Sequence, residues 1–217
     1  MKRLLLDLDS YGGTDPLEMF PLFLKKTAEV LAPRLAVVFH QLLRLGSFPI
    51  SWRVADVTPI PQDPPSSSAS NNRPISLTPI LSKVFERLVS VRLGRFMESR
   101  GELPTTEVTN RKGHGTCDAL LYVAHTLQNA LEIGQEARIL QVDFSADFDR
   151  VNDQEILFKL CSVGVGGAVL SVRTQFLSDR SQYVMVDSCR SNMVPGVPQE
   201  VFWARSCSSC TLESFSL

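Results

Sequence analysis

Four polar side chains that could bind a divalent cation follow one short apolar run. Residues 139–142 lead directly into Asp143, and Ser145, Asp147 and Asp149 follow at intervals of two. A carboxylate at the end of a strand is held rigidly, and carboxylate oxygens are the ligands that Mg²⁺ and Ca²⁺ prefer. The pattern predicts a strand that ends in a cation-binding turn.

Three kinds of site compete with a simple solvated acidic turn. A calcium loop would use Asp143, Ser145 and Asp147, but it requires glycine where Phe148 stands and glutamate where Gln154 stands. A phosphoryl-accepting aspartate requires an acid two residues later, and Ser145 cannot act as one at neutral pH. A two-metal phosphoryl-transfer site requires a strand-end carboxylate, and Phe148 suits the floor under a sugar. On these residues alone, the two-metal site and the solvated turn both stay open.

The elements that must position this cluster can be predicted from periodicity and from turn residues. Residues 15–49 indicate a helix that is broken or restarted at Pro33 and closed by Gly46 and Pro49. Residues 52–61 alternate as a strand does and end at prolines, and residues 62–72 have the composition of a loop. A strong helical stripe follows within residues 75–99, formed by Leu81, Val84, Phe85, Leu88, Val89, Leu93 and Phe96.

The second half of the chain is expected to continue with helices and one further strand. Residues 110–118 contain Gly113 and Gly115 and are predicted to form a turn. This turn leads into a helix that ends at Gly134. After the acidic cluster, the pattern predicts helices over residues 154–163 and 169–177 and a strand over residues 181–187. Residues 200–217 show neither period.

The amino-acid composition limits the classes of protein to which the chain can belong. The 217 residues are 44% hydrophobic and 21% charged, which is enough for a core of one domain or somewhat more. The chain has 22 basic and 23 acidic residues, so its net charge is −1. A free-standing nucleic-acid-binding domain usually has an excess of basic residues, so this balance argues against one. Five scattered cysteines favour a reducing, intracellular location, cytoplasmic or nuclear. We expect no signal peptide and no transmembrane segment.

Five sequence boxes, taken in order, carry a family resemblance. "FSADFDRVN" resembles the "FSxAFDxVxH" box of reverse transcriptases from non-LTR retrotransposons, the LINE-like and jockey-like group. Before it stand "WRVADVTPIPQ", "NNRPISLTPILSKVFERLV" and "LPTTEVTNRKGHGTCDALL", and after it stands "GVPQ". Each box is weak alone, but together they cover residues 52–199 in the order of that family.

The resemblance implies a mixed α+β fold, namely part of a right-hand polymerase with the fingers and the front of the palm. The chain is expected to be mostly helical, with a small incomplete sheet. On this basis we predict an N-terminal helical segment at residues 1–50, a fingers-like region at 51–135, a partial palm at 136–199 and an irregular tail at 200–217.

The resemblance also assigns roles to residues of the acidic box. Asp143 is implied as the catalytic, metal-ligating carboxylate, with the carbonyl of Phe144, a nucleotide-binding residue, beside it. Phe148 is implied as the steric gate that rejects a ribose 2′-hydroxyl. The family's cofactor is Mg²⁺, which one carboxylate is not expected to bind productively. Asp147 departs from the small residue or lysine usual in the family, and its negative charge is expected to perturb the site.

Three further residues are implied to contact the incoming nucleotide. Arg73 and Arg111 lie in fingers boxes, where a guanidinium suits triphosphate oxygens. Gln199 is implied to pack near the nucleotide. Gln62 replaces a basic residue of the family, so a phosphate contact is expected to be weaker. The family's partners are an RNA template and a DNA primer, whereas the balanced charge of this chain predicts weak or no nucleic-acid binding.

After Gln199 the chain departs from the family text. The family continues "GSVLGPLLFxLY", and this chain reads "EVFWARSCSSCT". One G inserted before a back-translation of residue 200 restores a compatible text, so we hypothesise a single-base deletion. Cys207 and Cys210 are then an accidental pair, because a zinc site needs four ligands.

These observations lead to an expectation about activity. The family's second group of catalytic carboxylates, in a "YADD"-type hairpin, and its thumb have no counterpart in the 217 residues. We therefore expect an inactive reverse transcriptase fragment with an exposed sheet edge and poor solubility. The alternative is a non-catalytic domesticated module that binds RNA or protein, which the near-neutral charge disfavours.

Overall fold

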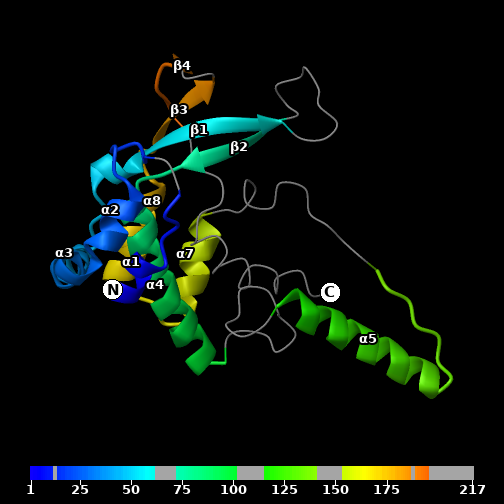
Figure 1. Ribbon diagram of the computed structural model, residues 1–217. Coiled ribbons are helices and arrows are strands. Elements are labelled where there is room, and N and C mark those ends of the chain that lie inside the picture. The colour runs from blue at the N-terminus through cyan, green and yellow to red at the C-terminus, as the bar shows by residue number, and fades with distance from the viewer. Residues whose placement is uncertain (12–13, 62–71, 102–114, 141–152, 187–188, 196–217) are drawn as a thin grey trace.

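The computed structural model describes residues 1–11, 14–61, 72–101, 115–140, 153–186 and 189–195. It is a mixed helical and β structure in which helices pack together and a small sheet lies beside them (Figure 1). The helices, in chain order, are α1 Lys2–Leu6, α2 Pro21–Lys26, α3 Ala28–Leu45, η1 Ile50–Arg53, α4 Ile80–Ser99, α5 Thr116–Glu132, α7 Asp153–Ser162 and α8 Ala168–Leu177. The strands are β1 Val54–Pro61, β2 Asn72–Leu77, β3 Ser181–Val186, β4 Cys189–Arg190 and β5 Val194–Pro195.

The sheet joins segments that are far apart in the sequence. Its strand order is β2–β1–β3–β4, and β5 also pairs with β3. β1 runs antiparallel to β2 and parallel to β3, so that Asp56 lies opposite Leu77 on one side and Tyr183 on the other. A parallel pair cannot be closed by a tight turn, and α4, α5, α7 and α8 all come between its two strands in the chain.

The core is built on α4 and on a cluster of aromatic rings. Phe85 of α4 lies edge-to-face with Phe39 of α3, with ring centroids 5.1 Å apart, and Phe48 makes a similar contact with Phe176 of α8 at 5.1 Å. Trp52 of η1 packs against Phe39, Phe48 and Phe85. The predicted stripe on α4 is confirmed, since all seven of its residues belong to this core or pack against it.

The junction after α3 depends on one glycine. Gly46 ends α3 in the left-handed conformation, with φ of 62°. A Cβ at this position would also lie 2.8 Å from the Ser171 side chain of α8. The Gly46 carbonyl accepts hydrogen bonds from Ser171 Oγ (2.9 Å) and Gln175 Nε2 (3.0 Å). The predicted stop at Gly46 is confirmed, and the close approach of α8 gives it a second reason.

The predicted helix break at Pro33 is wrong. α3 continues through Pro33, which is exposed, and the break lies earlier, at Thr27. Thr27 Oγ1 donates to the Phe23 carbonyl at 2.7 Å and ends α2 there. The Pro33 side chain is exposed, so its ring takes no space from the core.

Two further expectations about strands fail. β2 was not expected, because its residues 72–77 contain Pro74 and merge with the helical pattern that follows. It forms at the edge of the sheet, where the missing N–H of proline is tolerated. The strand predicted over residues 139–142 is wrong for Ile139 and Leu140, which have no regular structure and are exposed. Residues 141 and 142 lie outside the described residues.

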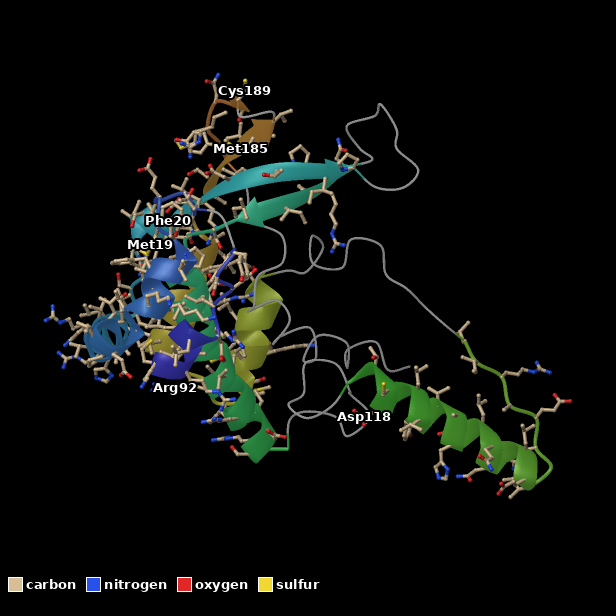
Figure 2. The ribbon with its side chains drawn as sticks, in the orientation of Figure 1. Met19, Phe20, Arg92, Asp118, Met185 and Cys189 are labelled. Atoms are coloured by element: carbon tan, nitrogen blue, oxygen red, sulfur yellow. The ribbon has the colours of Figure 1, made fainter. Side chains whose placement is uncertain are left out.

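The helix α5 forms without burying a side chain. The helix predicted to end at Gly134 is therefore confirmed. The Gly115 N–H donates to Asp118 Oδ2 at 2.7 Å, and this bond caps the first turn of the helix. Figure 2 labels Asp118 at this end of the helix. Its apolar residues Leu120, Leu121 and Leu131 are each about two-thirds exposed. None of the described helices combines the length and the apolar character that a membrane crossing requires.

Candidate functional site

Most of the predicted site lies outside the described residues. Asp143, Phe144, Phe148, Arg111 and Gln199 fall in that part, so the acidic cluster and its roles stay predictions. Among the described residues, no group of three or more His, Cys, Asp or Glu side chains could hold a metal ion. What the structure does describe is the sheet that carries Arg73 and the helices that support this sheet.

Arg73 lies on a partly open face of the sheet. It belongs to β2 and is paired with Ile60 of β1. Side chains alternate between the two faces of a strand, and residues directly opposite one another share a face. Arg73 therefore shares its face with Asp56 and, through the pairing of β1 with β3, with Tyr183. The Arg73 side chain is exposed on this face.

Arg190 is a residue of this face that the sequence analysis missed. Its Nη2 donates to Asp56 Oδ1 at 2.8 Å, and its guanidinium lies 3.6 Å from the centre of the Tyr183 ring. The two contacts hold the short strand β4 against β1 and β3. No local pattern predicts the contact with Asp56, because Asp56 and Arg190 belong to distant parts of the sequence.

Within the box "SKVFER" on α4, Ser82 and Glu86 form a buried polar pair. Ser82 Oγ donates to Glu86 Oε1 at 2.7 Å, and the two residues are 0% and 3% exposed. Burial raises the pKa of Glu86 to about 7, because it outweighs the Ser82 hydrogen bond and the charges of Arg180, Lys83 and Arg173. Burial also lowers the pKa of Lys83, against the attraction of Glu86 and Asp15.

Arg180 connects this pair to the beginning of β3. Its Nη1 donates to the Phe176 carbonyl at 2.9 Å, and its guanidinium lies 4.4 Å from the centre of the Phe176 ring. Burial lowers its pKa to about 10, although Glu86 acts in the opposite direction. Glu86 on α4 and Arg180, at the junction of α8 and β3, therefore attract each other electrostatically. The only sequence signal for this role was the i, i+4 spacing of Ser82 and Glu86 beside an apolar stripe.

Asp15 holds the beginning of α4 in place. Its Oδ2 accepts the Ile80 N–H at 2.7 Å, at the first residue of the helix, and it is 8% exposed. Its Oδ1 accepts the N–H groups of Leu17 (2.9 Å) and Met19 (2.8 Å). A negative charge at a helix N-terminus is favoured by the helix dipole as well as by these bonds. The N-terminal segment is therefore fastened to the helix on which the core is built.

We expect Asp15→Ala to lower the free energy of unfolding by roughly 2–3 kcal/mol, because a buried amide of α4 is left without an acceptor. Asp15→Asn, which keeps one carbonyl oxygen, should lose less. Urea unfolding followed by circular dichroism measures both. Asp9→Ala is the matched control, since among the described residues Asp9 accepts only the exposed Tyr11 N–H, at 3.0 Å. Equal losses for Asp15→Ala and Asp9→Ala would contradict this role of Asp15.

Comparison with known proteins identifies the class of this chain. It is 31% identical over 169 residues to a probable RNA-directed DNA polymerase from transposon X-element of Drosophila melanogaster, and 31% identical over 169 residues to the RNA-directed DNA polymerase from mobile element jockey of the same species. Each match covers 76% of this chain and 18% of the relative. The Pol polyprotein of the type-1 retrotransposable element R2 from Popillia japonica is 28% identical over 158 residues, or 71% of this chain and 21% of the relative. No family model matches the chain.

These relatives define a class, the RNA-directed DNA polymerases of mobile elements. Within it, the chain belongs to the family of non-LTR retrotransposon reverse transcriptases, as the five boxes predicted. It spans about a fifth of the length of the curated relatives that it matches.

Proposed function

We propose that the chain is the fingers and the front of the palm of a right-hand polymerase, taken from a retrotransposon reverse transcriptase. The proposal is supported by one observation above all, the five boxes in order over residues 52–199, together with a match that covers 76% of the chain. The mixed helical and β architecture is compatible with it. The exposed position of Arg73 on the sheet also fits a residue that contacts nucleotide phosphates.

In this proposal Asp143 is a metal-ligating carboxylate with the Phe144 carbonyl beside it, and Phe148 is the steric gate that rejects a ribose 2′-hydroxyl. Arg73 and Arg111 would contact the triphosphate and Gln199 would pack beside the nucleotide. Mg²⁺, when bound in such a site, activates the attacking 3′-oxygen and stabilises the leaving pyrophosphate. An RNA template follows from the relatives' names, and a DNA primer is implied by the family resemblance. Both are part of the proposal for this chain.

We further propose that the 217-residue chain does not polymerise by itself. Among its residues, Asp143 alone matches a catalytic carboxylate of the family, and two Mg²⁺ ions about 4 Å apart need at least two carboxylates. Residues 200–217 stand where the family has "GSVLGPLLFxLY". Sequencing the encoding DNA tests the proposed base deletion, which is wrong if no downstream frame restores the family text.

A primer-extension assay tests the activity. With an RNA template, a DNA primer, deoxynucleotides and Mg²⁺, we expect no extension product from this chain, whereas the jockey polymerase serves as the positive control. Asp143→Ala is the paired variant. Extension by the unmodified chain that disappears in Asp143→Ala would overturn the proposed inactivity and support the role of Asp143. Extension that survives in both would overturn the two proposals together.

A further inference from the structure

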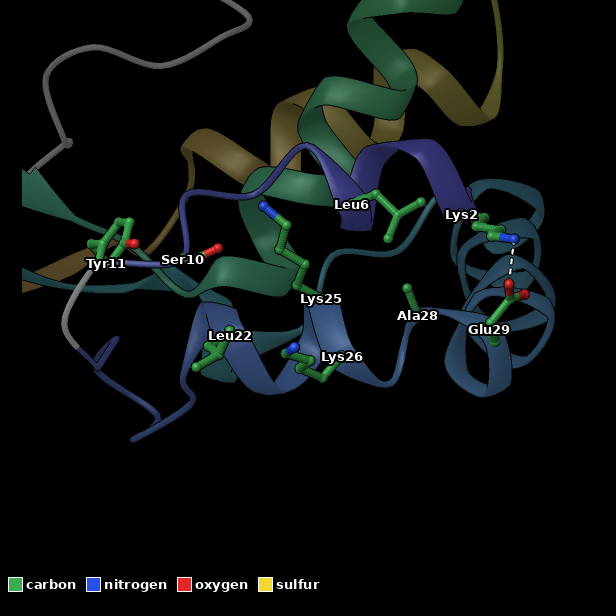
Figure 3. A pocket seen from close by; sticks show the side chains of 9 residues that line it. All are labelled: Lys2, Leu6, Ser10, Tyr11, Leu22, Lys25, Lys26, Ala28 and Glu29. Atoms are coloured by element: carbon green, nitrogen blue, oxygen red, sulfur yellow. Dashed lines mark hydrogen bonds and ion pairs between the residues drawn. The ribbon is translucent and has the colours of Figure 1, made fainter.

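A pocket lies among the N-terminal helices, ahead of all five boxes. It has a volume of about 810 Å³ and is formed by α1, the segment after it, α2 and the beginning of α3 (Figure 3). Its lining includes Leu6, Tyr11, Leu22, Lys25, Lys26 and Ala28. The volume falls in the range of sites that enclose a small organic group, which is also enough for a few side chains of a peptide.

The pocket carries a net positive charge. At one end, Lys2 is paired with Glu29, the acidic residue among the described residues that line it (Figure 3). Lys25 Nζ donates to the Leu8 carbonyl at 3.1 Å, which positions the ammonium and leaves two of its protons available. Lys26 is exposed and has no ion-pair partner among the described residues. Two ammonium groups are thus available to carboxylates.

Large apolar side chains are exposed in this pocket and along α2, which contributes to it. Leu6 and Leu22, both in the lining, are 42% and 45% exposed. Phe20, at the N-cap of α2, and Phe23, within it, are 57% and 58% exposed. Tyr11 is almost fully exposed, so its ring is open to a side chain from outside. Exposed apolar side chains gathered in so short a segment are typical of a surface that contacts another protein.

Two ammonium groups beside an apolar lining fit a peptide better than a nucleic acid or a lipid surface. A nucleic-acid strand carries a charge at every nucleotide and needs a longer basic groove, whereas Glu29 already neutralises Lys2 here. A lipid surface is bound by an amphipathic helix laid along it, and α1 and α2 have only five and six residues, which is fewer than two turns each. Carboxylates that alternate with apolar side chains satisfy both parts of the lining.

We propose that this pocket binds an acidic peptide segment of a partner protein, in which carboxylates alternate with large apolar side chains. The carboxylates pair with Lys25 and Lys26, and the apolar side chains contact Leu6 and Leu22. Because apolar residues of α2 are exposed beyond the lining, the occupant is a chain that continues past the pocket. The site lies outside residues 52–199, so it is independent of the polymerase boxes.

Fluorescence anisotropy with the full chain tests the proposal, and the probe is a labelled synthetic peptide in which Glu alternates with Leu and Phe. We expect it to bind at about 50 mM KCl and to bind more weakly at about 500 mM, because salt screens the charges. Lys25→Gln/Lys26→Gln should lose about fivefold in affinity at the lower salt concentration and less at the higher one. Leu22→Ser should lose about fivefold at both, because it removes an apolar contact.

Matched variants separate this pocket from general attraction to charged or apolar residues. Arg92→Gln removes an exposed positive charge from α4, labelled in Figure 2, and should leave the affinity unchanged. Leu120→Ser removes an exposed leucine from α5 and should also leave it unchanged. Lys26→Gln alone keeps the bond of Lys25 to Leu8 and should lose about threefold in affinity, with folding checked by circular dichroism.

Further probes distinguish the class of ligand. A peptide with every Glu replaced by Gln should bind at least about fivefold more weakly at low salt, because it has no charge to pair with the lysines. A peptide of alternating Glu and Ser should also bind more weakly, because it lacks the apolar side chains. Single-stranded RNA and vesicles that contain phosphatidylserine are the competitors, and neither should displace the acidic apolar peptide at equal concentration.

The proposal is overturned if the unmodified chain does not bind the acidic apolar peptide at low salt, or if the pocket variants bind it as tightly as Arg92→Gln and Leu120→Ser do. It is also overturned if the Gln peptide binds equally well, or if RNA or the vesicles displace the peptide. None of these outcomes bears on the assignment of the five boxes, which the extension assay and the DNA sequence test separately.

Discussion

Phe85→Ala is expected to lower the free energy of unfolding by roughly 3–5 kcal/mol, the range measured for large-to-small changes in well-packed cores. Phe85 is fully buried, and its ring contacts Phe39, Phe48 and Trp52, which come from α3, the segment after it and η1. The alanine leaves a cavity where four elements meet, and these elements cannot all move inward. Urea unfolding monitored by circular dichroism measures the loss.

Two variants make this result interpretable. Phe158→Ala on α7 removes a phenylalanine that is 76% exposed, and it should change stability by about 0.5 kcal/mol or less. Phe85→Leu keeps most of the volume and should cost roughly 1–2 kcal/mol, which remains measurable if Phe85→Ala does not fold. Similar losses for Phe85→Ala and Phe158→Ala would show that the aromatic cluster does not hold the fold together.

Glu86 is expected to make stability depend on pH. Its pKa is raised in the folded chain to about 7, compared with 4.5 for an exposed glutamate, so the folded state binds more protons between these values. Stability should therefore fall as pH rises from about 4.5 to about 7, by up to roughly 3 kcal/mol, and this group should add no slope outside that window. Denaturant unfolding at several pH values measures the slope.

Substitutions at Glu86 separate its charge from its packing. Glu86→Gln keeps the hydrogen bond from Ser82 and removes the titration, so it should abolish the slope while remaining close to the unmodified chain near pH 5. Glu86→Ala should also abolish the slope. It should be less stable than the unmodified chain by roughly 3 kcal/mol near pH 4.5, because it opens a cavity, and by less as the pH rises toward 7, because the unmodified chain itself loses stability there. Glu132→Gln on the exposed helix α5 is the control and should leave the pH dependence unchanged. A slope that persists in Glu86→Gln would assign it to another group.

How much of this molecule could be predicted from sequence depended on the range of the interactions involved. The stripe on α4, the stop at Gly46 and the existence of α5, α7, α8, β1 and β3 all follow from local periodicity and turn chemistry, and the structure confirms them. The family assignment came from ordered motifs and was confirmed by the relatives. The acidic cluster lies outside the described residues, so its roles stay predictions.

What the tertiary structure alone decided are the contacts between distant segments. β2 is a strand because β1 lies beside it, although its own residues resemble the beginning of a helix. Asp15 caps α4, Arg180 approaches Glu86, and Arg190 pairs with Asp56, across separations that no local pattern encodes. Periodicity shows which face of an element is apolar, whereas the partner of a buried charge is set by the packing of the whole chain.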